Sequence, residues 1–466
     1  TIGDSGDTTN VVGTLQNNGA ALVGDISSVV AGTGLSGGGT SGAVTLNSDL
    51  LAKQAGTNFT NSVLVGTSGT GTLSSATGNT GVGIGVLGAL TSGDNNVAVG
   101  LDSLQANTTG SSNTAIGQTA LAANTTGASN TAMGMCSLLA NTTGDFNVAI
   151  GHSALLKNTT ADSNTAIGLC AMVCNTTGGV NVAVGYEALE QNTTAFENTG
   201  VGYRALKGNT TGCQNASFGT CSTYTNSTGD ANTGLGYKAL FANTTADNNT
   251  AIGANALDAN TTGACNTAVG VGALGTNTTA ANNAAIGYGA LFANTTGADN
   301  TAMGSCALNK NTTGADNTAV GKCAAACTTT GASNAAFGYN SFCANTTGAS
   351  NTAVGKDSLK ANTTAANNTA VGKDSLRTNT TGAGNVALGM SAMYSNTTGD
   401  FNIGIGRSTL QNNTTADCNT AVGYLALETN TTGIENVGVG SASLDANSTG
   451  DYNVAVGANS LSANTT

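Results

Sequence analysis

The chain has 466 residues, of which 68 are Gly, none is Pro or Trp, and only 8% are charged. Its net charge of -12 includes no basic stripe, which argues against nucleic acid as a partner. No apolar run is long enough to insert into a membrane. The hydrophobic residues, 39% of the total, recur at a fixed period, and disordered low-complexity chains lack such regularity.

Residues 1–78 lack the repeat that fills the rest of the chain. They contain GTGLSGGG at 32–39, followed by AVTLN at 43–47. Short apolar runs between glycines are typical of short strands joined by Gly turns. We therefore expect residues 1–78 to form a Gly/Ser/Thr-rich β adaptor or shaft segment.

A 17-residue repeat fills residues 79–466, and the unit at 113–129 reads NTAIGQTALAANTTGAS. Steps of 17 from Asn79 to Asn453 meet Asn at all 23 positions, and Gly follows four residues later in every unit. A period that never slips indicates stacked coils, because one inserted residue would break the pairing between neighbours. The sequence predicts an all-β solenoid (a β-roll) of about 23 coils. A set of equivalent positions, one from each repeat unit, is called a column below.

Each unit predicts two short strands. Residues 114–116 alternate in character, Gly117 bends the chain, and Ala120 and Leu121 lie in a second strand. Because they hold the large apolar residues, we expect the Ile116 and Leu121 columns to be buried. The Ala115 column holds only Ala, Gly or Ser, which indicates a close approach to another backbone, most simply that of another chain.

Residues 124–127 (NTTG) predict the return turn, with the Asn124 column exposed. The first Asn of each unit, by contrast, predicts a ladder of stacked amides inside the coil or along a turn. The residues to which we assign this structural ladder role are Asn113, Asn130, Asn147, Gly117, Gly134, Gly151, Ile116 and Leu121.

Two large apolar side chains per coil make a thin roll that would be weak as a monomer. Lateral association of identical chains is the expected remedy, most simply as a parallel trimer. The last residues, 464–466, stop inside a turn without a polar cap, although solenoids ordinarily need capping repeats. We therefore expect that the chain either is truncated or stacks head-to-tail on another subunit into a filament, which would be a second form of self-association.

Two stretches carry a family resemblance. Residues 25–40 (DISSVVAGTGLSGGGT) resemble the shaft segments of bacteriophage tail fibres. The NTAIG units, as at 113–117, resemble the short repeats of trimeric autotransporter adhesin heads and related phage fibres. The resemblance implies a trimeric, surface-exposed β-roll used for attachment or as a stalk. The adhesin-head repeat is usually shorter than the one in this chain, so the coil cross-section is expected to differ.

The sequence offers few groups for catalysis. His152 is the only histidine and occupies a variable position of one coil. No GxxxxGK[ST] loop occurs, and the calcium-binding GGxGxDxUx pattern is missing. We therefore expect no enzyme activity, no metal site and no cofactor.

The 11 cysteines contain no Cys-x-x-Cys pair of the kind that binds metal. Cys170 and Cys174 share a spacing with Cys323 and Cys327, which makes each pair a disulfide candidate within its coil. A bridge between the stacked Cys306 and Cys323 is a further candidate, because coils about 4.8 Å apart suit disulfide geometry. The alternative is that Cys serves as a small hydrophobic residue.

The Asn124 column holds Asn in 21 of 22 units from Asn107 to Asn464, and Thr follows two residues later in every unit. Each of the 21 is an Asn-x-Thr acceptor for N-linked glycans. The alternative is that Asn caps the turn and Thr forms a hydroxyl ladder. The candidate glycosylation sites include Asn107, Asn124, Asn141, Asn158, Asn175, Asn192, Asn209, Asn226, Asn243 and Asn260.

A structural extracellular or virion fibre, either a stalk or an adhesin, explains these features best. Its expected partners are other copies of itself and a cell-surface or glycan receptor. A densely glycosylated fibril that polymerises head-to-tail is the alternative, and an ice-binding solenoid with Thr ladders is a third hypothesis. A polysaccharide-cleaving spike would need carboxylates clustered across coils, and the acidic residues show no such column.

Overall fold

The computed structural model describes residues 58–66 and 70–466, together with the backbone of seven short strands ahead of them. These strands are β1 (Gln16–Asn17), β2 (Ala20–Ala21), β3 (Val29–Val30), β4 (Leu35–Ser36), β5 (Gly38–Gly39), β6 (Asn47–Ser48) and β7 (Lys53–Gly56). Most of the predicted adaptor at 1–78 lies outside the described residues.

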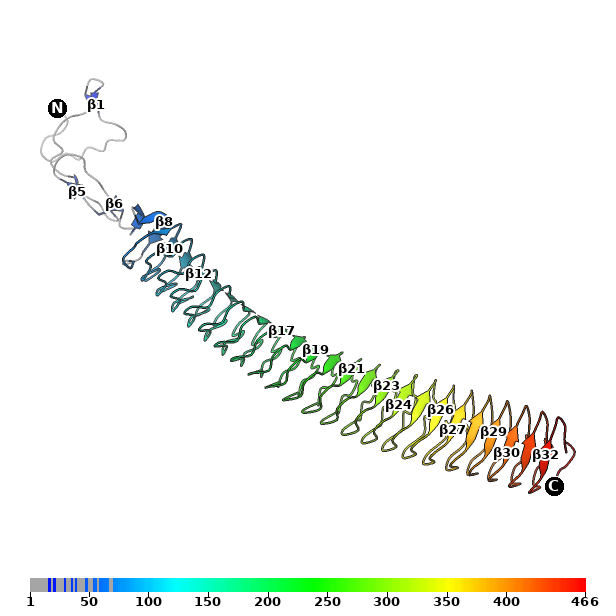
Figure 1. Cartoon of the computed structure of the whole chain (residues 1–466). Coiled ribbons are helices and arrows are strands. Elements are labelled where there is room, and N and C mark those ends of the chain that lie inside the picture. The colour runs from blue at the N-terminus through cyan, green and yellow to red at the C-terminus, as the bar shows by residue number, and fades with distance from the viewer. Residues whose placement is uncertain are drawn as a thin grey trace.

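The repeat region is a parallel β-solenoid with one three-residue strand per coil. Each strand pairs in parallel with the equivalent strand of the next coil, as Thr114 does with Thr131, from β10 through β32. The strands follow one another along one side of the rod (Figure 1). The 17-residue coil predicted from the sequence is confirmed, and the described residues contain no helix.

The strands of this sheet have the following bounds: β8 (Phe59–Val65), β9 (Ala76–Thr77), β10 (Thr80–Val82), β11 (Val97–Val99), β12 (Thr114–Ile116), β13 (Thr131–Met133), β14 (Val148–Ile150), β15 (Thr165–Ile167), β16 (Val182–Val184), β17 (Thr199–Val201), β18 (Ala216–Phe218), β19 (Thr233–Leu235), β20 (Thr250–Ile252), β21 (Thr267–Val269), β22 (Ala284–Ile286), β23 (Thr301–Met303), β24 (Thr318–Val320), β25 (Ala335–Phe337), β26 (Thr352–Val354), β27 (Thr369–Val371), β28 (Val386–Leu388), β29 (Ile403–Ile405), β30 (Thr420–Val422), β31 (Val437–Val439) and β32 (Val454–Val456).

The remaining residues of each coil form turns, so the predicted second strand at Ala120 and Leu121 is wrong. Thr119 and Leu121 have φ of 55° and 52°, a left-handed conformation that curls the chain instead of extending it. Hydrogen bonds between coils continue through these turns: the Leu121 N–H donates to the Ser137 carbonyl at 3.0 Å, and the Thr125 N–H donates to the Thr142 carbonyl at 2.9 Å. The stack is therefore hydrogen-bonded on more than its sheet side.

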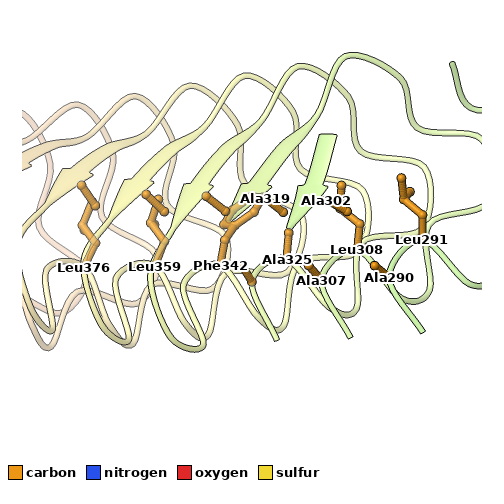
Figure 2. Packing of buried hydrophobic residues seen from close by; sticks show 14 of the residues in the cluster. Ala290, Leu291, Ala302, Ala307, Leu308, Ala319, Ala325, Phe342, Leu359 and Leu376 are labelled. Carbon is orange, nitrogen blue, oxygen red and sulfur yellow. The ribbon is translucent and has the colours of Figure 1, made fainter. Parts of the chain in front are cut away.

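The core is one narrow column of large side chains lined by small ones. Leu121 and its equivalents from Leu87 to Leu444 are buried, as predicted, and Ala115 and Ala120 pack beside them with no exposed surface, whereas Leu461 of the last coil is 49% exposed. Figure 2 shows this packing in neighbouring coils, where Leu291, Leu308, Ala325 and Phe342 succeed one another along the axis.

The predicted burial of the Ile116 column is wrong, because Ile116 is 37% exposed. Side chains alternate across a strand, so Ala115 on the inside places both Thr114 and Ile116 on the outside. The small cross-section of the coil explains why the smaller residue faces inward: Leu121 already fills the interior, and only Ala, Gly or Ser fits beside it.

The predicted close backbone approach exists, but it lies within the chain. A Cβ at Gly117, which has φ of 137°, would lie 2.6 Å from the carbonyl oxygen of Gly134 in the next coil. Gly117, Gly134 and Gly151 stack directly on one another in this way. Ala115 faces the core of its own coil, so the Ala115 column is not a contact with a second chain.

Two buried amide ladders run along the rod. Asn113 donates through Nδ2 to Oδ1 of Asn96 at 3.2 Å, and its backbone N–H donates to the same oxygen at 2.9 Å. The pattern continues at Asn130 and Asn147, where the backbone N–H of each donates at 2.9 Å to the Asn side chain of the preceding coil. The predicted internal ladder is therefore present.

The second ladder is the Asn124 column, whose predicted exposure is wrong. Asn124 is fully buried, and its Nδ2 donates to Oδ1 of Asn107 at 2.8 Å and to the Gly127 carbonyl at 2.9 Å. The same carbonyl accepts from Nδ2 of Asn113 at 2.8 Å, so Gly127 links the two ladders. The turn folds the amide inward because this satisfies polar groups that the return of the chain would otherwise leave unpaired.

Candidate assembly surface and surface pocket

The outward face of the sheet is a continuous apolar strip. The Ile116 column holds Val, Ile, Met, Leu or Phe at every position from Val82 to Val456. Its larger members stay accessible, as Met133 and Phe218 do at 40% each. The adjacent Thr114 column holds only Thr, Val, Ala and Ile. Neither column contains a charged residue, so the strip extends over 23 strands without interruption.

Each edge of the strip carries charge of one sign. The Ser112 column, just before the strand, contains the exposed acidic residues Glu197, Asp299, Asp316 and Glu435 and no base. The Gln118 column, just after the strand, contains the exposed basic residues Lys322, Lys356, Lys373 and Arg407 and no acid. We call these two sets the acidic rim and the basic rim.

Two lysines of the basic rim also contact carboxylates of their own coil. Nζ of Lys356 lies 4.0 Å from Asp357, and Nζ of Lys373 lies 3.6 Å from Asp374. The lysine side chains nevertheless remain 56% and 58% exposed, so both stay accessible to a partner.

An aromatic and ionic cluster stabilises the coils around Glu187. Tyr186 and Tyr203 stack with ring centroids 5.3 Å apart, and Glu187 accepts from Lys207 at 2.6 Å and from Arg204 at 2.8 Å. Burial alone would raise the pKa of Glu187, but hydrogen bonds from Lys207, Tyr186 and Arg204 outweigh it and lower the pKa to about 2. The stabilisation that ionised Glu187 contributes is therefore complete at neutral pH and is lost progressively as the pH falls from about 4.5 towards 2.

One surface pocket of about 270 Å³ interrupts the regular turns. Gly272 and Gly289 stand in two successive coils where most other coils have a side chain, and the aromatic rings of Tyr288 and Phe292 border the hollow that results. Asn309 donates through Nδ2 to the Gly289 carbonyl at 2.8 Å, which leaves its side-chain oxygen free to accept. The full lining is Asn255, Val271, Gly272, Tyr288, Gly289, Phe292 and Asn309, none of them charged.

The structure buries the Asn-x-Thr acceptors that the sequence singled out. Every Asn from Asn107 to Asn447 in this column has no exposed surface, and Nδ2 of Asn124 uses both hydrogens in the ladder. A glycan would replace one of these hydrogens and would need space that the core does not have. Glycosylation stays a prediction, and bare asparagine is the result that this fold leads us to expect.

The Thr columns beside these asparagines differ from each other. Thr125 is half-buried, and its hydroxyl donates to the Thr142 carbonyl at 3.0 Å, so it contributes to coil stacking. Thr126 is exposed. Of these two columns, only the Thr126 column is exposed enough to order water, and ice binding stays a hypothesis that a thermal-hysteresis assay would test.

All 11 cysteines lie in the described coils, and all are free thiols. The structure therefore forms neither the Cys170–Cys174 nor the Cys323–Cys327 bridge, nor one between Cys306 and Cys323. Burial raises the pKa of Cys170, and the nearby Glu190 and Glu187 raise it further, which favours the unreactive thiol.

His152 lies on the Gln118 column, with Nδ1 3.1 Å from the Ser153 hydroxyl. Ser153 follows it directly in the chain, a proximity that we did not predict. Within the described residues no carboxylate is hydrogen-bonded to either side chain, and no group of three or more His, Cys, Asp or Glu could hold a metal ion.

Sequence reasoning missed the rims and the pocket. The rims are visible in the sequence once the columns are aligned, because one column lacks bases and the other lacks acids. The pocket left a signal in the paired Gly272 and Gly289, but its shape depends on where the Phe292 ring lies, which the sequence does not specify.

No protein-family model and no curated protein matches this chain. The resemblance to phage tail fibres and trimeric autotransporter adhesins therefore stays a prediction that rests on the repeat pattern.

Proposed function

We propose that this protein is a structural fibre that serves as a stiff stalk or adhesin in attachment and carries out no catalysis. The observation that carries the proposal is the unbroken stack of 23 parallel strands with two buried amide ladders. At about 4.8 Å per coil such a stack is roughly 110 Å long, and every coil is hydrogen-bonded to both neighbours. A shape of this kind holds two ends apart at a fixed distance.

The site of action we propose is outside the cell, at a cell surface or on a virion. No described segment forms a helix of the length and apolarity that crossing a bilayer requires.

Atomic force microscopy tests the proposal. We expect straight or gently curved particles of one contour length that stay stiff over their whole length. Compact particles, or thread-like particles with freely varying curvature, would contradict the role of a spacer.

For the attachment role we propose that the pocket at Tyr288 and Phe292 contacts a neutral sugar of a receptor. Exposed aromatic rings offer apolar faces to the C–H groups of a pyranose, and the amides of Asn255 and Asn309 suit its hydroxyl groups. The volume of about 270 Å³ is below the range of about 300–1,000 Å³ for drug-sized ligands. It therefore suits a single sugar unit.

A glycan array with purified protein tests this contact. Tyr288→Ala should abolish any sugar signal, and Gly272→Asn should fill the pocket without strain, because Asn255 already adopts the same left-handed conformation with φ of 54°. Tyr339→Ala is the matched control, since Tyr339 occupies the same column away from the pocket. Equal binding by all three variants, or no binding by the wild-type protein, would overturn the sugar contact and leave the spacer role intact.

A further inference from the structure

We propose that the apolar strip is the contact between copies of this chain, which lie parallel to one another with the acidic rim of each beside the basic rim of the next. This inference rests on the proposed fibre, because it needs a straight rod whose columns keep their phase.

The strip is too large to remain in water. It is about 10 Å wide and roughly 110 Å long, a footprint on the order of 1,100 Å² for one rod. A standard stable interface buries about 800 Å² per partner, and monomers rarely expose contiguous apolar patches of more than a few hundred Å². The strip thus exceeds what a stable pairing needs, and a surface that recurs in every coil matches another rod with the same repeat.

This match of length and period indicates that the partner covering the strip is a second copy of the chain. A second copy of the chain offers a strip with the same spacing between coils, so the Ile116 column of each copy faces the Thr114 column of the other, which offers threonine methyl groups and Val, Ala and Ile side chains. The net charge of -12 would otherwise keep the rods apart, but neither the Thr114 nor the Ile116 column bears any charge. Affinity therefore comes from the strip, while the rims decide orientation.

Symmetry selects the parallel arrangement. A rotation axis that runs along the rods places the acidic rim of one copy beside the basic rim of the next, whether the bundle holds two chains or three. A twofold axis across the rods makes them antiparallel and places acid beside acid and base beside base. Because like charges in apposition disfavour a complex, the rims disfavour the antiparallel pair.

One strand shows the register that this arrangement needs. Asp316 and Lys322 lie at the two ends of β24 (Thr318–Val320), so in an unshifted parallel pair each Asp316 lies across from Lys322 of the partner. Exposed ion pairs of this kind are individually weak, about 0–1 kcal/mol each, so they choose between orientations and do not supply the affinity.

Reversal of one rim tests the proposal directly. The wild-type chain should self-associate in light-scattering and sedimentation measurements. Changing Lys322, Lys356, Lys373 and Arg407 to Glu gives two acidic rims, and self-association should weaken at least tenfold at low salt. Changing Glu197, Asp299, Asp316 and Glu435 to Lys should also weaken it, but less, because the net charge of -12 then falls to -4 instead of growing to -20. A variant with both reversals should recover, and an equimolar mixture of the two single-rim variants should form mixed assemblies.

The outcomes separate this proposal from the fibre itself. Gold bound to a tag ahead of Thr1 should mark the same end of all rods in an assembly under the electron microscope. A monomeric wild-type chain, gold at opposite ends, or single-rim reversals that associate as the wild type does would each overturn the parallel contact. If single rods keep their length in the monomeric variants, the fibre role stands even where the contact fails.

Discussion

At the scale of the residue, the buried amides determine most of the behaviour of the rod. Each Asn of the Asn124 column donates to the one before it, so one substitution affects two hydrogen bonds. The column has one such defect at Thr328. Oδ1 of Asn311 is buried there without a hydrogen-bond partner, and Nδ2 of Asn345 reaches the Thr328 hydroxyl only at 3.4 Å.

Thr328→Asn should repair this ladder. The new amide would donate to Asn311 and accept from Asn345, which removes a buried unsatisfied acceptor and restores a good hydrogen bond. We expect the free energy of unfolding to rise by about 1–3 kcal/mol. Thermal melting followed by circular dichroism measures the gain. Thr330→Asn, on the exposed Thr column, is the control and should change stability little. A neutral or destabilising Thr328→Asn would show that the ladder does not stabilise the stack.

At the scale of the element, adjacent coils compensate for each other in the core. The Leu121 column contains Ala325 followed by Phe342, a small side chain beside a large one (Figure 2). We infer that the Phe342 ring occupies volume that Ala325 leaves open, since interiors are packed without large voids.

A double-mutant cycle tests this compensation. Ala325→Leu alone should overpack the core and destabilise it by about 1–3 kcal/mol. Combined with Phe342→Leu it restores the leucines found in most other coils, and the double variant should melt near the wild type. The expected coupling energy is at least about 1 kcal/mol. Simple additivity of the two changes would contradict shared packing between these coils.

The coil at 215–231 interrupts the apolar core of the rod. Thr223 is the only polar residue in the Leu121 column, and Ser217 replaces Ala or Gly in the Ala115 column. The hydrophobic core is divided at this coil, with one cluster ending at Leu206 and the next beginning at Ala239. Buried hydroxyls replace apolar contacts here, and Ser217 donates to the Ser222 carbonyl at 2.9 Å.

We expect this coil to open first. In hydrogen exchange followed by mass spectrometry, peptides from 215–231 should exchange faster than those from 249–265. Thr223→Leu with Ser217→Ala should join the two clusters and slow that exchange, because it buries apolar groups in place of hydroxyls. Thr220→Leu, at an exposed position of the same coil, should leave it unchanged. Uniform exchange along the wild-type rod would contradict a weak coil.

The sequence predicts the period, the coil and the buried Leu121 column, because a phase that never slips and a nearly constant side-chain size leave little choice. It does not predict which side of the strand faces inward. Because side chains alternate along a strand, Ala115 and Ile116 must lie on opposite faces. The large apolar side chain of Ile116 led to the prediction that it faces inward, but the coil is too narrow to hold it beside Leu121. The Asn124 column was wrongly predicted to be exposed, because Asn in a turn usually is. Its constancy was a signal of burial, because most exposed positions, such as Gln118, change from coil to coil; the exposed Thr126 column, which is constant, shows that this signal does not decide burial alone.

At the scale of the whole molecule, the coil is a unit of length. In-phase removal of one coil, as in deletion of 249–265, joins equivalent positions and keeps every column aligned. We expect this variant to melt close to the wild type, because a solenoid is stabilised mainly by contacts between neighbouring coils. Deletion of 249–266 is the control. It shifts every later column by one residue against the earlier ones, and its melting should fall sharply or split into two transitions. Equal tolerance of both deletions would contradict the stacked-coil account.

The most direct measurement of the central claim, one coil for each repeat of the sequence, is the length of the rod in electron micrographs before and after in-phase deletion of ten coils. Removal of 249–418 joins residue 248 to Asn419 with all columns in phase. At about 4.8 Å per coil, the rod should shorten by roughly 48 Å from roughly 110 Å and keep its width. An unchanged length, a change far from that value, or a collapsed particle would contradict the account.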